Sequence, residues 1–349
     1  MIKVLLFPNL NVNNNDNRFH EIVKIVSNKL SDKITFIAVD DTNKIPFFTD
    51  NINIIMCNHV TPEVLSLNKP IIVCSRNDST STSSVRKYLF NDRVVAYFKD
   101  YVFRDYTLFK PYYLYNRYHF NTINDIYNIA PSEIIQKYNK HTQLTDEHLK
   151  KIKCVTWNLF QYSNIVHPYM TLLSSTDITY DRKNIDLFMV CHDHKEHPIL
   201  YKHRSCGKII IEQISTKHTL TYCTTSLDTN LYLQTIQTAK ICIAPYGLGE
   251  RIALDQYGIL AGCIVIKPPM DHIVSDPNIY SPEHDMFEYC KADFSDVEEI
   301  ILNILNNYDD IYAKKAMERR KKLLTYDENY YATQFYANIK DVIDTLESD

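Results

Sequence analysis

The sequence predicts an α/β protein of two domains, each built around a mostly parallel sheet. Short apolar runs rich in β-branched residues alternate with helical patterns, and this alternation starts afresh near residue 185. The length supports two domains, because a single core stops growing at roughly 250–300 residues and the chain has 349.

The first half alternates strands and helices of ordinary length. In order, the sequence predicts a strand at 2–7, a helix near 17–31, strands at 34–39, 52–57 and 70–75, and a helix near 83–90. Right-handed crossovers between such strands give a Rossmann-like layer structure. Residues 94–170 are more aromatic and less regular, with helical patterns near 122–139 and 144–152 and a candidate strand at 154–160.

A polar segment without periodicity, residues 174–184, is the expected linker. After it the sequence predicts strands at 185–191, 219–224, 240–245 and 263–268, helices near 197–214 and 229–238, a glycine-rich helix, a helical tract at 296–324 and a terminal helix near 328–347. We therefore place the first domain at residues 1–175, the second at 176–326 and a C-terminal helix at 327–349.

Composition excludes several classes of protein. The formal charge is −4 and the two signs are interleaved, which argues against a nucleic-acid binder or a polybasic membrane anchor, although a local basic groove and peripheral membrane contact stay open. No apolar run approaches the roughly 20 residues that cross a bilayer, and the first ten residues turn polar too soon for a signal peptide.

Most of the nine cysteines, among them Cys57, Cys74, Cys191 and Cys242, lie in strand-like runs. We expect a cytoplasmic protein with reduced, buried thiols.

Four of the chain's five glycines lie within residues 244–263, "APYGLGERIALDQYGILAGC". The turn from Pro245 to Gly249 joins a strand to a helix, where free backbone N–H groups and the helix dipole favour a phosphate. Gly247 and Gly249 would let the phosphate approach the backbone closely. The chain has no P-loop motif, and its first half has no glycine for a dinucleotide fingerprint.

On a helical wheel, Arg251, Asp255, Gly258 and Gly262 fall within roughly 60° of one another, on a helix that is otherwise apolar. One interpretation is that this stripe lines a cleft between the domains and meets a phosphorylated ligand. The alternative is an ordinary i,i+4 ion pair, with the glycines fitted against a neighbouring helix.

The segment "ICIAPYGLGERIALDQYGILAGCIVIKP" resembles the donor-binding segment of GT-B fold glycosyltransferases, in particular the exostosin-like and related families. The shared features are a strand ending in proline, a Gly-x-Gly loop, a helix with an arginine and an acidic residue, and "AGC" before an apolar strand. Residues 288–305 resemble the segment that closes such domains, and the resemblance spans residues 185–325. The usual acidic position holds Tyr257 here, so Glu250 and Asp255 both remain candidates for binding ribose or sugar hydroxyls.

This resemblance implies two Rossmann-like domains facing a cleft, with the terminal helix returning to the first domain. It implies transfer of a sugar from a UDP- or GDP-sugar to the hydroxyl of a glycan or glycoconjugate, with no obligatory cofactor or metal. The backbone of Gly247, Leu248 and Gly249 and the guanidinium of Arg251 would offset the charge of the leaving diphosphate.

The run "CHDHKEH" at residues 191–197 follows the first strand of the second domain. We predict no metal there, because the histidines are too close in sequence for the usual ligand spacing and no second cluster completes a tetrahedron. In a GT-B arrangement His192, or Arg204 on the next helix, would contact the donor; the alternative is a solvated loop.

An inverting transfer needs a general base on a loop of the first domain. Asp16 and His20, and Arg76 and Asp78, are the candidates, and of these we single out Asp78 and His20; each alternatively caps a helix or faces solvent. The runs "RYHF" and "PYYLY" are either aromatic core or a platform for an acceptor sugar. Two other functions stay open, a non-enzymatic α/β binding module and another nucleotide-sugar enzyme such as an epimerase.

Overall fold

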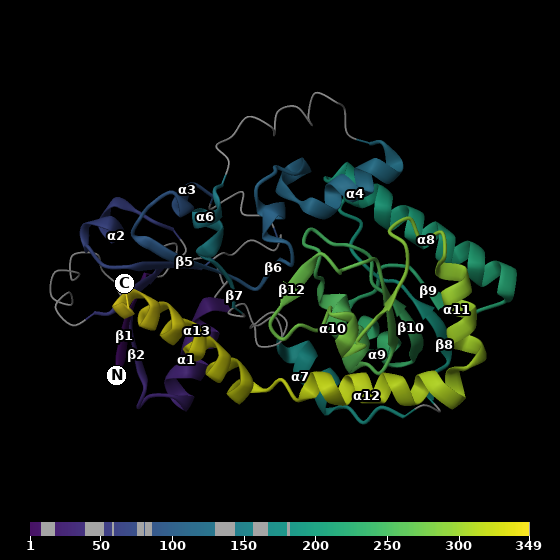
Figure 1. The fold of residues 1–349 in the computed structure, drawn as a ribbon. Helices are drawn as coiled ribbons and strands as arrows, with labels where there is room; N and C mark the ends of the chain where they lie inside the picture. Colours follow the sequence, from purple (N-terminus) through teal and green to yellow (C-terminus); the bar gives the residue numbers. More distant parts are fainter. Residues whose placement is uncertain are drawn as a thin grey trace.

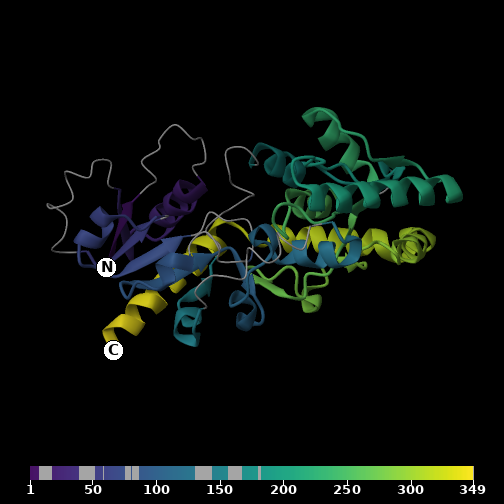
Figure 2. The same ribbon diagram turned by 90° about the horizontal axis from the view of Figure 1, so that it is seen from above.

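The computed structural model describes residues 1–7, 18–38, 52–57, 59–74, 80, 86–129, 144–155, 167–179 and 182–348. Two lobes lie side by side, each around its own sheet, and the C-terminal helices run along both (Figure 1). The view from above shows the same separation (Figure 2). The predicted fold class, two parallel α/β domains with a returning C-terminal helix, is confirmed.

The first lobe holds a six-stranded sheet in the order β2-β1-β3-β4-β5-β7, with every pairing parallel. Its strands are β1 (Ile2–Phe7), β2 (Ile34–Ala38), β3 (Ile54–Cys57), β4 (Ile71–Cys74), β5 (Val94–Lys99) and β7 (Ile152–Cys154). β3 and β4 are buried along their whole length, as continuous apolar runs in a parallel sheet require. The first four strands lie where the sequence predicts them. In the aromatic segment 94–170 the sequence predicts one strand, at 154–160, which overlaps β7 only at Cys154, and it does not predict β5.

The second lobe holds a five-stranded parallel sheet in the order β13-β11-β10-β8-β9. Its strands are β8 (Ile185–Phe188), β9 (Tyr222–Cys223), β10 (Ala239–Ile243), β11 (Ile264–Lys267) and β13 (Glu288–Tyr289). In both sheets the first strand of the lobe lies between the second and the third. The strand order therefore reverses between β1 and β3 in the first lobe and between β8 and β10 in the second. In open α/β sheets a ligand binds at the carboxyl end of such a switch point.

Helices cover these sheets. They are α1 (Arg18–Lys29), α2 (Pro62–Ser66), α3 (Arg86–Leu89), α4 (Tyr118–Tyr127), α6 (Asp146–Lys150), α7 (His167–Ser175), α8 (Pro198–His218), α9 (Thr229–Gln237), α10 (Ala253–Leu260), α11 (Val297–Asn306), α12 (Ala313–Leu324) and α13 (Glu328–Ser348). A π-helical turn at Tyr308–Tyr312 divides the predicted tract 296–324 into α11 and α12. Within the described residues, no helix is long and apolar enough to cross a membrane.

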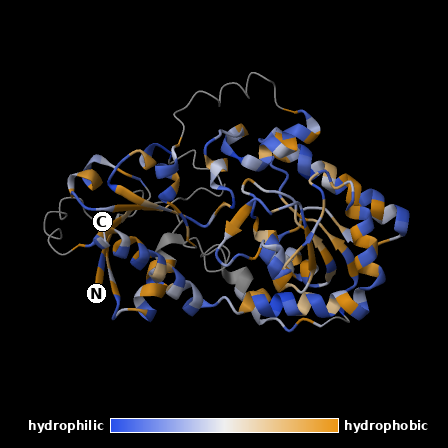
Figure 3. Ribbon diagram, in the orientation of Figure 1, coloured by the Kyte–Doolittle hydropathy of each residue, from blue (hydrophilic) through white to orange (hydrophobic). Residues whose placement is uncertain are grey.

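The C-terminal helix α13 belongs to the core of the first lobe. It packs against α1, and Phe335 meets Phe98 of β5 with ring centroids 6.3 Å apart. Apolar residues gather on the strands and on the inward faces of the helices, whereas α12 is largely hydrophilic (Figure 3). The last helix therefore fastens the second lobe to the first.

Part of the first half of the chain packs on the second lobe. β6 (Tyr101–Phe103) pairs antiparallel with β12 (Ile273–Ser275), α4 packs against α8, and α7 packs against α10. One apolar cluster contains Tyr101, Phe120 and Leu173 together with residues of the second sheet. The chain between β5 and β8 thus brings side chains of the first half to the carboxyl end of the second sheet.

Candidate functional site

Two loops leave the switch point of the second sheet, and one arginine joins them. The histidine loop, residues 191–197, follows β8, and the glycine loop, residues 245–251, follows β10. Arg204 of α8 is buried, donates from Nε to the carbonyl of Tyr246 at 3.0 Å, and donates from Nη1 to the carbonyl of His192. Burial lowers the pKa of this guanidinium, partly offset by Cys191 and Asp193.

The glycine loop is held by cations on its carbonyl side. Residues 246–248 each accept a hydrogen bond through the carbonyl oxygen, the first from Arg204 at 3.0 Å, the second from His119 Nε2 at 3.0 Å and the third from Arg117. A trans peptide points its N–H away from its C=O, so the N–H groups of residues 247–249 are turned away from these cations. The Gly247 N–H donates within the loop to the Gly249 carbonyl at 3.0 Å.

Gly247 is required by close packing as well as by the loop. A Cβ atom here would lie 2.2 Å from Cγ2 of Ile252 and 3.2 Å from Nη2 of Arg204. The absence of a side chain is therefore what allows Ile252 to pack against the loop, with Arg204 close beside it.

Glu250 connects the glycine loop to the first lobe. Its side chain is fully buried and accepts a hydrogen bond from the backbone N–H of Thr80 at 3.2 Å, in the segment that follows β4. Oε1 lies 3.3 Å from Nδ1 of His119, an ion-pair contact without good hydrogen-bond direction. Burial alone would raise the pKa of this carboxyl, but the charge of His119 outweighs burial and holds the pKa below its usual range.

The protonation of the His119–Glu250 pair follows by elimination. A carbonyl oxygen only accepts, so Nε2 of His119 carries the hydrogen that it donates to Gly247. Its Nδ1 faces a carboxylate oxygen, and two bare acceptors at that distance would repel each other. One of the two partners therefore carries a proton, and the ion-pair contact of 3.3 Å joins α4 to the glycine loop.

Arg251 lies just before α10, which begins at Ala253 with Ile252 as its N-cap. Its guanidinium carbon lies 5.6 Å from the ring centroid of Tyr101, on β6. Burial lowers the pKa of Arg251, but nearby Asp100 and the surrounding tyrosines outweigh burial and raise it overall. Arg251 therefore carries a fixed positive charge where the glycine loop meets the end of the first sheet.

The helical stripe predicted from the wheel is not formed, because Arg251 precedes the helix. Asp255 is fully buried and accepts hydrogen bonds from Lys267 Nζ and the Tyr280 hydroxyl, both at 2.8 Å, and from the Ile252 N–H at 3.1 Å. A Cβ on Gly258 would lie 2.7 Å from Val265 of the adjacent strand. These residues face the second sheet and not a cleft.

Gly262 has a different task again. It follows the C-cap of α10 with φ of +70°, a left-handed conformation that favours glycine. Gly258 and Gly262 therefore serve packing and helix termination, and they do not extend a ligand-facing stripe.

His203 is a neutral histidine that accepts a hydrogen bond from the backbone of the glycine loop. His203 of α8 is fully buried between the rings of Tyr246 and Phe294, and its Nε2 accepts a hydrogen bond from the Tyr246 N–H at 3.3 Å. Burial first, and then the charges of His119 and Arg204, lower the pKa of His203 to about 3. The ring is neutral at physiological pH and acts as an acceptor.

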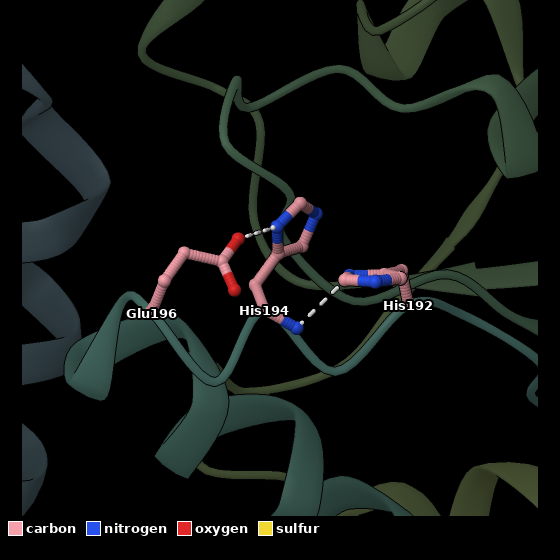
Figure 4. A group of neighbouring side chains, drawn as sticks. All are labelled: His192, His194 and Glu196. Atoms are coloured by element: carbon pink, nitrogen blue, oxygen red, sulfur yellow. Dashed lines mark hydrogen bonds and ion pairs between the residues drawn. The ribbon is translucent and has the colours of Figure 1, made fainter.

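Three side chains of the histidine loop converge (Figure 4). Nδ1 of His194 lies 2.8 Å from a carboxylate oxygen of Glu196, and Nδ1 of His192 accepts from the backbone N–H of His194 at 3.1 Å. Asp193 pairs instead with Lys208 at 2.5 Å. Burial lowers the pKa of His194, the hydrogen bond to Glu196 opposes it, and Arg204 adds to the lowering.

The candidates for a general base are not placed near the site by this structure. Asp16, Arg76 and Asp78 lie outside the described residues, and of His20 only its position in α1 is described.

The side chains that sequence reasoning missed are His119, Arg117 and Thr80. The first two belong to "NRYHF", where basic residues interrupt an aromatic run, and that interruption was the available signal.

The aromatic runs are partly core. Tyr113 and Phe120 are buried, and Tyr113 meets Tyr118 edge to face with centroids 5.2 Å apart, whereas Tyr115 is 36% exposed.

All nine cysteines are free; Cys57, Cys74 and Cys242 are buried as predicted, and Cys191 is half-buried.

The chain matches no protein-family model and no curated protein. Among solved structures it is similar to a glycosyltransferase from Rickettsia africae ESF-5 (11% identity, 100% of this chain and 99% of that chain, TM-score 0.45). It is also similar to Anabaena Alr3699/HepE in complex with UDP (9%, 100% of each chain, 0.42). A third is an alpha-glucosyltransferase in complex with UDP-glucose and DNA containing an abasic site (9%, 98% of each chain, 0.45). With TM-scores below 0.5, these similarities assign neither a family nor a residue role, and the exostosin-like families are not singled out.

Proposed function

We propose that this protein is a glycosyltransferase that moves a sugar from a nucleotide diphosphate sugar to an acceptor hydroxyl. The observation that carries the proposal is the position of the glycine loop. It leaves the switch point of the second sheet and meets the first lobe through the Thr80–Glu250 hydrogen bond of 3.2 Å. A ligand bound at the carboxyl ends of both sheets would therefore touch this loop.

The charge around the loop favours a diphosphate. Arg117, His119 and Arg204 fix the carbonyl side of the loop, so its N–H groups face the other way, and Arg251 adds a positive charge that the buried carboxylate of Asp100 partly offsets. Preorganised donors of this kind stabilise charge that develops on a leaving group, and a site shielded from water strengthens them. In the proposed reaction, Arg251 and the N–H groups of Leu248 and Gly249 face the diphosphate, and no metal takes part in the transfer.

Of the two acidic candidates, we propose Glu250 for the sugar or ribose hydroxyls. Its partners, Thr80 and His119, come from the first half of the chain, so a donor can take their place at the boundary between the lobes. Asp255 is held by three donors of its own domain, which leaves its oxygens no free direction. We assign Asp255 to helix capping and to the burial of Lys267.

For the general base we retain Asp78, which precedes Thr80 by two residues in the sequence, with His20 as the second choice. The reaction needs one base to remove the proton of the acceptor hydroxyl as the bond to the sugar carbon forms. Asp78→Asn is expected to lower transfer at least 100-fold while donor binding persists. An equal loss of both would place Asp78 outside the chemistry.

The test of the proposal is a panel of UDP-sugars, GDP-sugars and free nucleotides, measured by thermal shift and calorimetry. We expect one nucleotide class to stabilise the protein, and Arg251→Ala to weaken it by about 10- to 100-fold, the worth of one charge-assisted contact. Arg182→Ala, an exposed arginine of the same lobe, is the matched control and retains binding. Slow release of free nucleotide from the bound donor separates an enzyme from a binding module. If no nucleotide or nucleotide sugar binds, the proposal fails.

A further inference from the structure

The histidine loop presents a set of side chains that the proposed transfer does not use. His192 and Glu196 are exposed and His194 is half-buried, and one ligand atom from each lies within 4.8 Å of the others. We propose that His192, His194 and Glu196 form a binding site for a divalent transition metal of the zinc type. The proposal rests on the geometry of this loop and is independent of the proposed function.

The local backbone explains why ligands so close in sequence converge. His194 has a φ of +51°, a left-handed conformation that is uncommon outside glycine. In an extended strand, the side chains of residues 192, 194 and 196 would stand in a row with their ends well apart. The left-handed residue turns the chain back, and the following N–H of His197 donates to the His194 carbonyl at 2.8 Å. The sequence argument against a metal rested on the usual ligand spacing and on the lack of a second cluster, whereas the left-handed turn at His194 brings three side chains of one loop together.

The distances suit a small ion after modest side-chain movement. Zinc binds imidazole nitrogen and carboxylate oxygen at about 2.0–2.2 Å, so tetrahedral ligand atoms lie about 3.4 Å apart. His194 Nδ1 and the Glu196 oxygen are already 2.8 Å apart, joined by a hydrogen bond whose proton the metal would replace. Small rotations of the half-buried and exposed rings bring the third ligand in. Water completes the shell, since three protein ligands with one open position form a common zinc arrangement.

The donor set selects the class of metal. Two imidazoles and one carboxylate suit Zn²⁺, Ni²⁺ and Cu²⁺, whereas Mg²⁺ and Ca²⁺ prefer an all-oxygen shell. Of the neighbouring positive charges, Lys208 is paired with Asp193 at 2.5 Å, and the Glu196 carboxylate in the ligand set offsets Arg204, which lies on the His192 carbonyl. Asp193 is thereby engaged and leaves the three ligands as the proposed set.

A metal here would stabilise the loop that supports the glycine loop. Arg204 donates to the carbonyl of His192 and to the carbonyl of Tyr246, so it joins the two loops. Fixing His192 through its ring fixes one of the two anchors of Arg204. The metal acts on the position of Arg204 and is not required for the transfer itself.

The experiment uses the full chain without a histidine tag, titrated with ZnCl₂ in calorimetry and thermal shift, with MgCl₂ as the counter-probe. We expect one Zn²⁺ per chain, a rise in Tm that EDTA reverses, and no response to Mg²⁺. His194→Ala and Glu196→Gln should each weaken Zn²⁺ at least tenfold. His197→Ala is the matched control, because its ring lies in the same loop, with its centroid 6.3 Å from that of His194, outside the ligand set.

The nine cysteines are the competing ligands, and Co²⁺ distinguishes them. Nitrogen and oxygen ligation gives a Co²⁺ spectrum without a thiolate-to-metal charge-transfer band, which is the expected result. A thiolate band that persists in His194→Ala, or Zn²⁺ affinity equal in wild type and His194→Ala, would overturn the proposal. Circular dichroism of each variant confirms that a loss of binding is not a loss of fold.

Discussion

Nδ1 of His119 lies 3.3 Å from a carboxylate oxygen of Glu250, with both side chains fully buried, while Nε2 of the same ring holds the carbonyl of Gly247 at 3.0 Å. The two residues are far apart in the sequence, and their contact joins α4 to the glycine loop. An ionisable pair removed from water is stable only when both partners are present, because either one alone is an unpaired buried charge.

A double-mutant cycle tests this contact. Glu250→Gln retains an acceptor for the Thr80 N–H, and His119→Gln retains a donor for the Gly247 carbonyl, so each variant removes mainly the charge. We expect each single variant to lose about 3–5 kcal/mol in urea unfolding, and the double variant to lose less than the sum by about 1–3 kcal/mol. The exposed pair Glu147–Lys150 at 2.7 Å serves as control and should show no measurable coupling. Additive losses at the buried pair would show that the two charges act independently.

Asp255 and Lys267 form a second buried pair, 2.8 Å apart and wholly within the second lobe. Burial lowers the pKa of Lys267 and Asp255 opposes that shift. Asp255→Asn should lower the free energy of unfolding by about 3–5 kcal/mol, because Lys267 is left without its counter-charge. Asp255→Asn/Lys267→Met should recover part of the loss.

The same variant decides the role of Asp255. If it is structural, as we propose, folded Asp255→Asn binds nucleotide with wild-type affinity at a temperature well below its Tm. A large loss of affinity in the folded variant would restore Asp255 as a ligand residue. Calorimetry at low temperature, with circular dichroism to confirm folding, provides both readings.

The sequence predicts the sheets well, because buried parallel strands are continuous apolar runs with clear ends, as at Ile54–Cys57 and Ile71–Cys74. It misses β5 since the run "VVAYFKDYVF" contains two strands, β5 and β6, separated only by Asp100. The helical wheel drawn for residues 251–262 predicts a wrong arrangement of Arg251, because α10 starts at Ala253. Ile252 occupies the N-cap and offers no side-chain cap, so the usual start signal is missing.

The sequence predicts only the part of the candidate site that local patterns encode. The glycine loop and Arg204 follow from local pattern, because a strand, a turn and a helix lie in one short segment. His119 and Thr80 reach the loop across 128 and 170 positions of the sequence respectively. Contacts at such separation are set by how the lobes pack, and no local spacing encodes them.

Gly247→Ala is expected to be costly. The new Cβ would lie 2.2 Å from Cγ2 of Ile252, a branched atom next to the backbone that cannot move aside, and 3.2 Å from Arg204. We expect a loss of about 1–3 kcal/mol in unfolding free energy and weaker nucleotide binding. Adding Ile252→Ala should recover stability by removing the clashing atom.

Gly207→Ala is the control for that substitution. Its Cβ would meet the terminal methyl of Met189 at 2.8 Å, the movable end of a flexible side chain, although Phe294 is also close at 3.0 Å. Alanine in the middle of α8 also gains helix propensity of about 1 kcal/mol. The net change should be small, so equal losses at positions 247 and 207 would contradict the packing argument.

His203 predicts how stability depends on pH. Its pKa falls from 6.5 to about 3 on folding. Between these two values the histidine is protonated in the unfolded chain and neutral in the native protein. Stability contributed by the neutral ring is complete above pH 6.5 and is lost as the pH falls toward 3, by about 1.4 kcal/mol per pH unit. His203→Gln keeps an acceptor for the Tyr246 N–H but cannot take up a proton. The difference in unfolding free energy between wild type and His203→Gln, measured by urea titration from pH 7 to pH 4, should therefore shrink or change sign in favour of the variant. A difference that stays constant over that range would mean that His203 titrates alike in both states and is not buried as the structure places it.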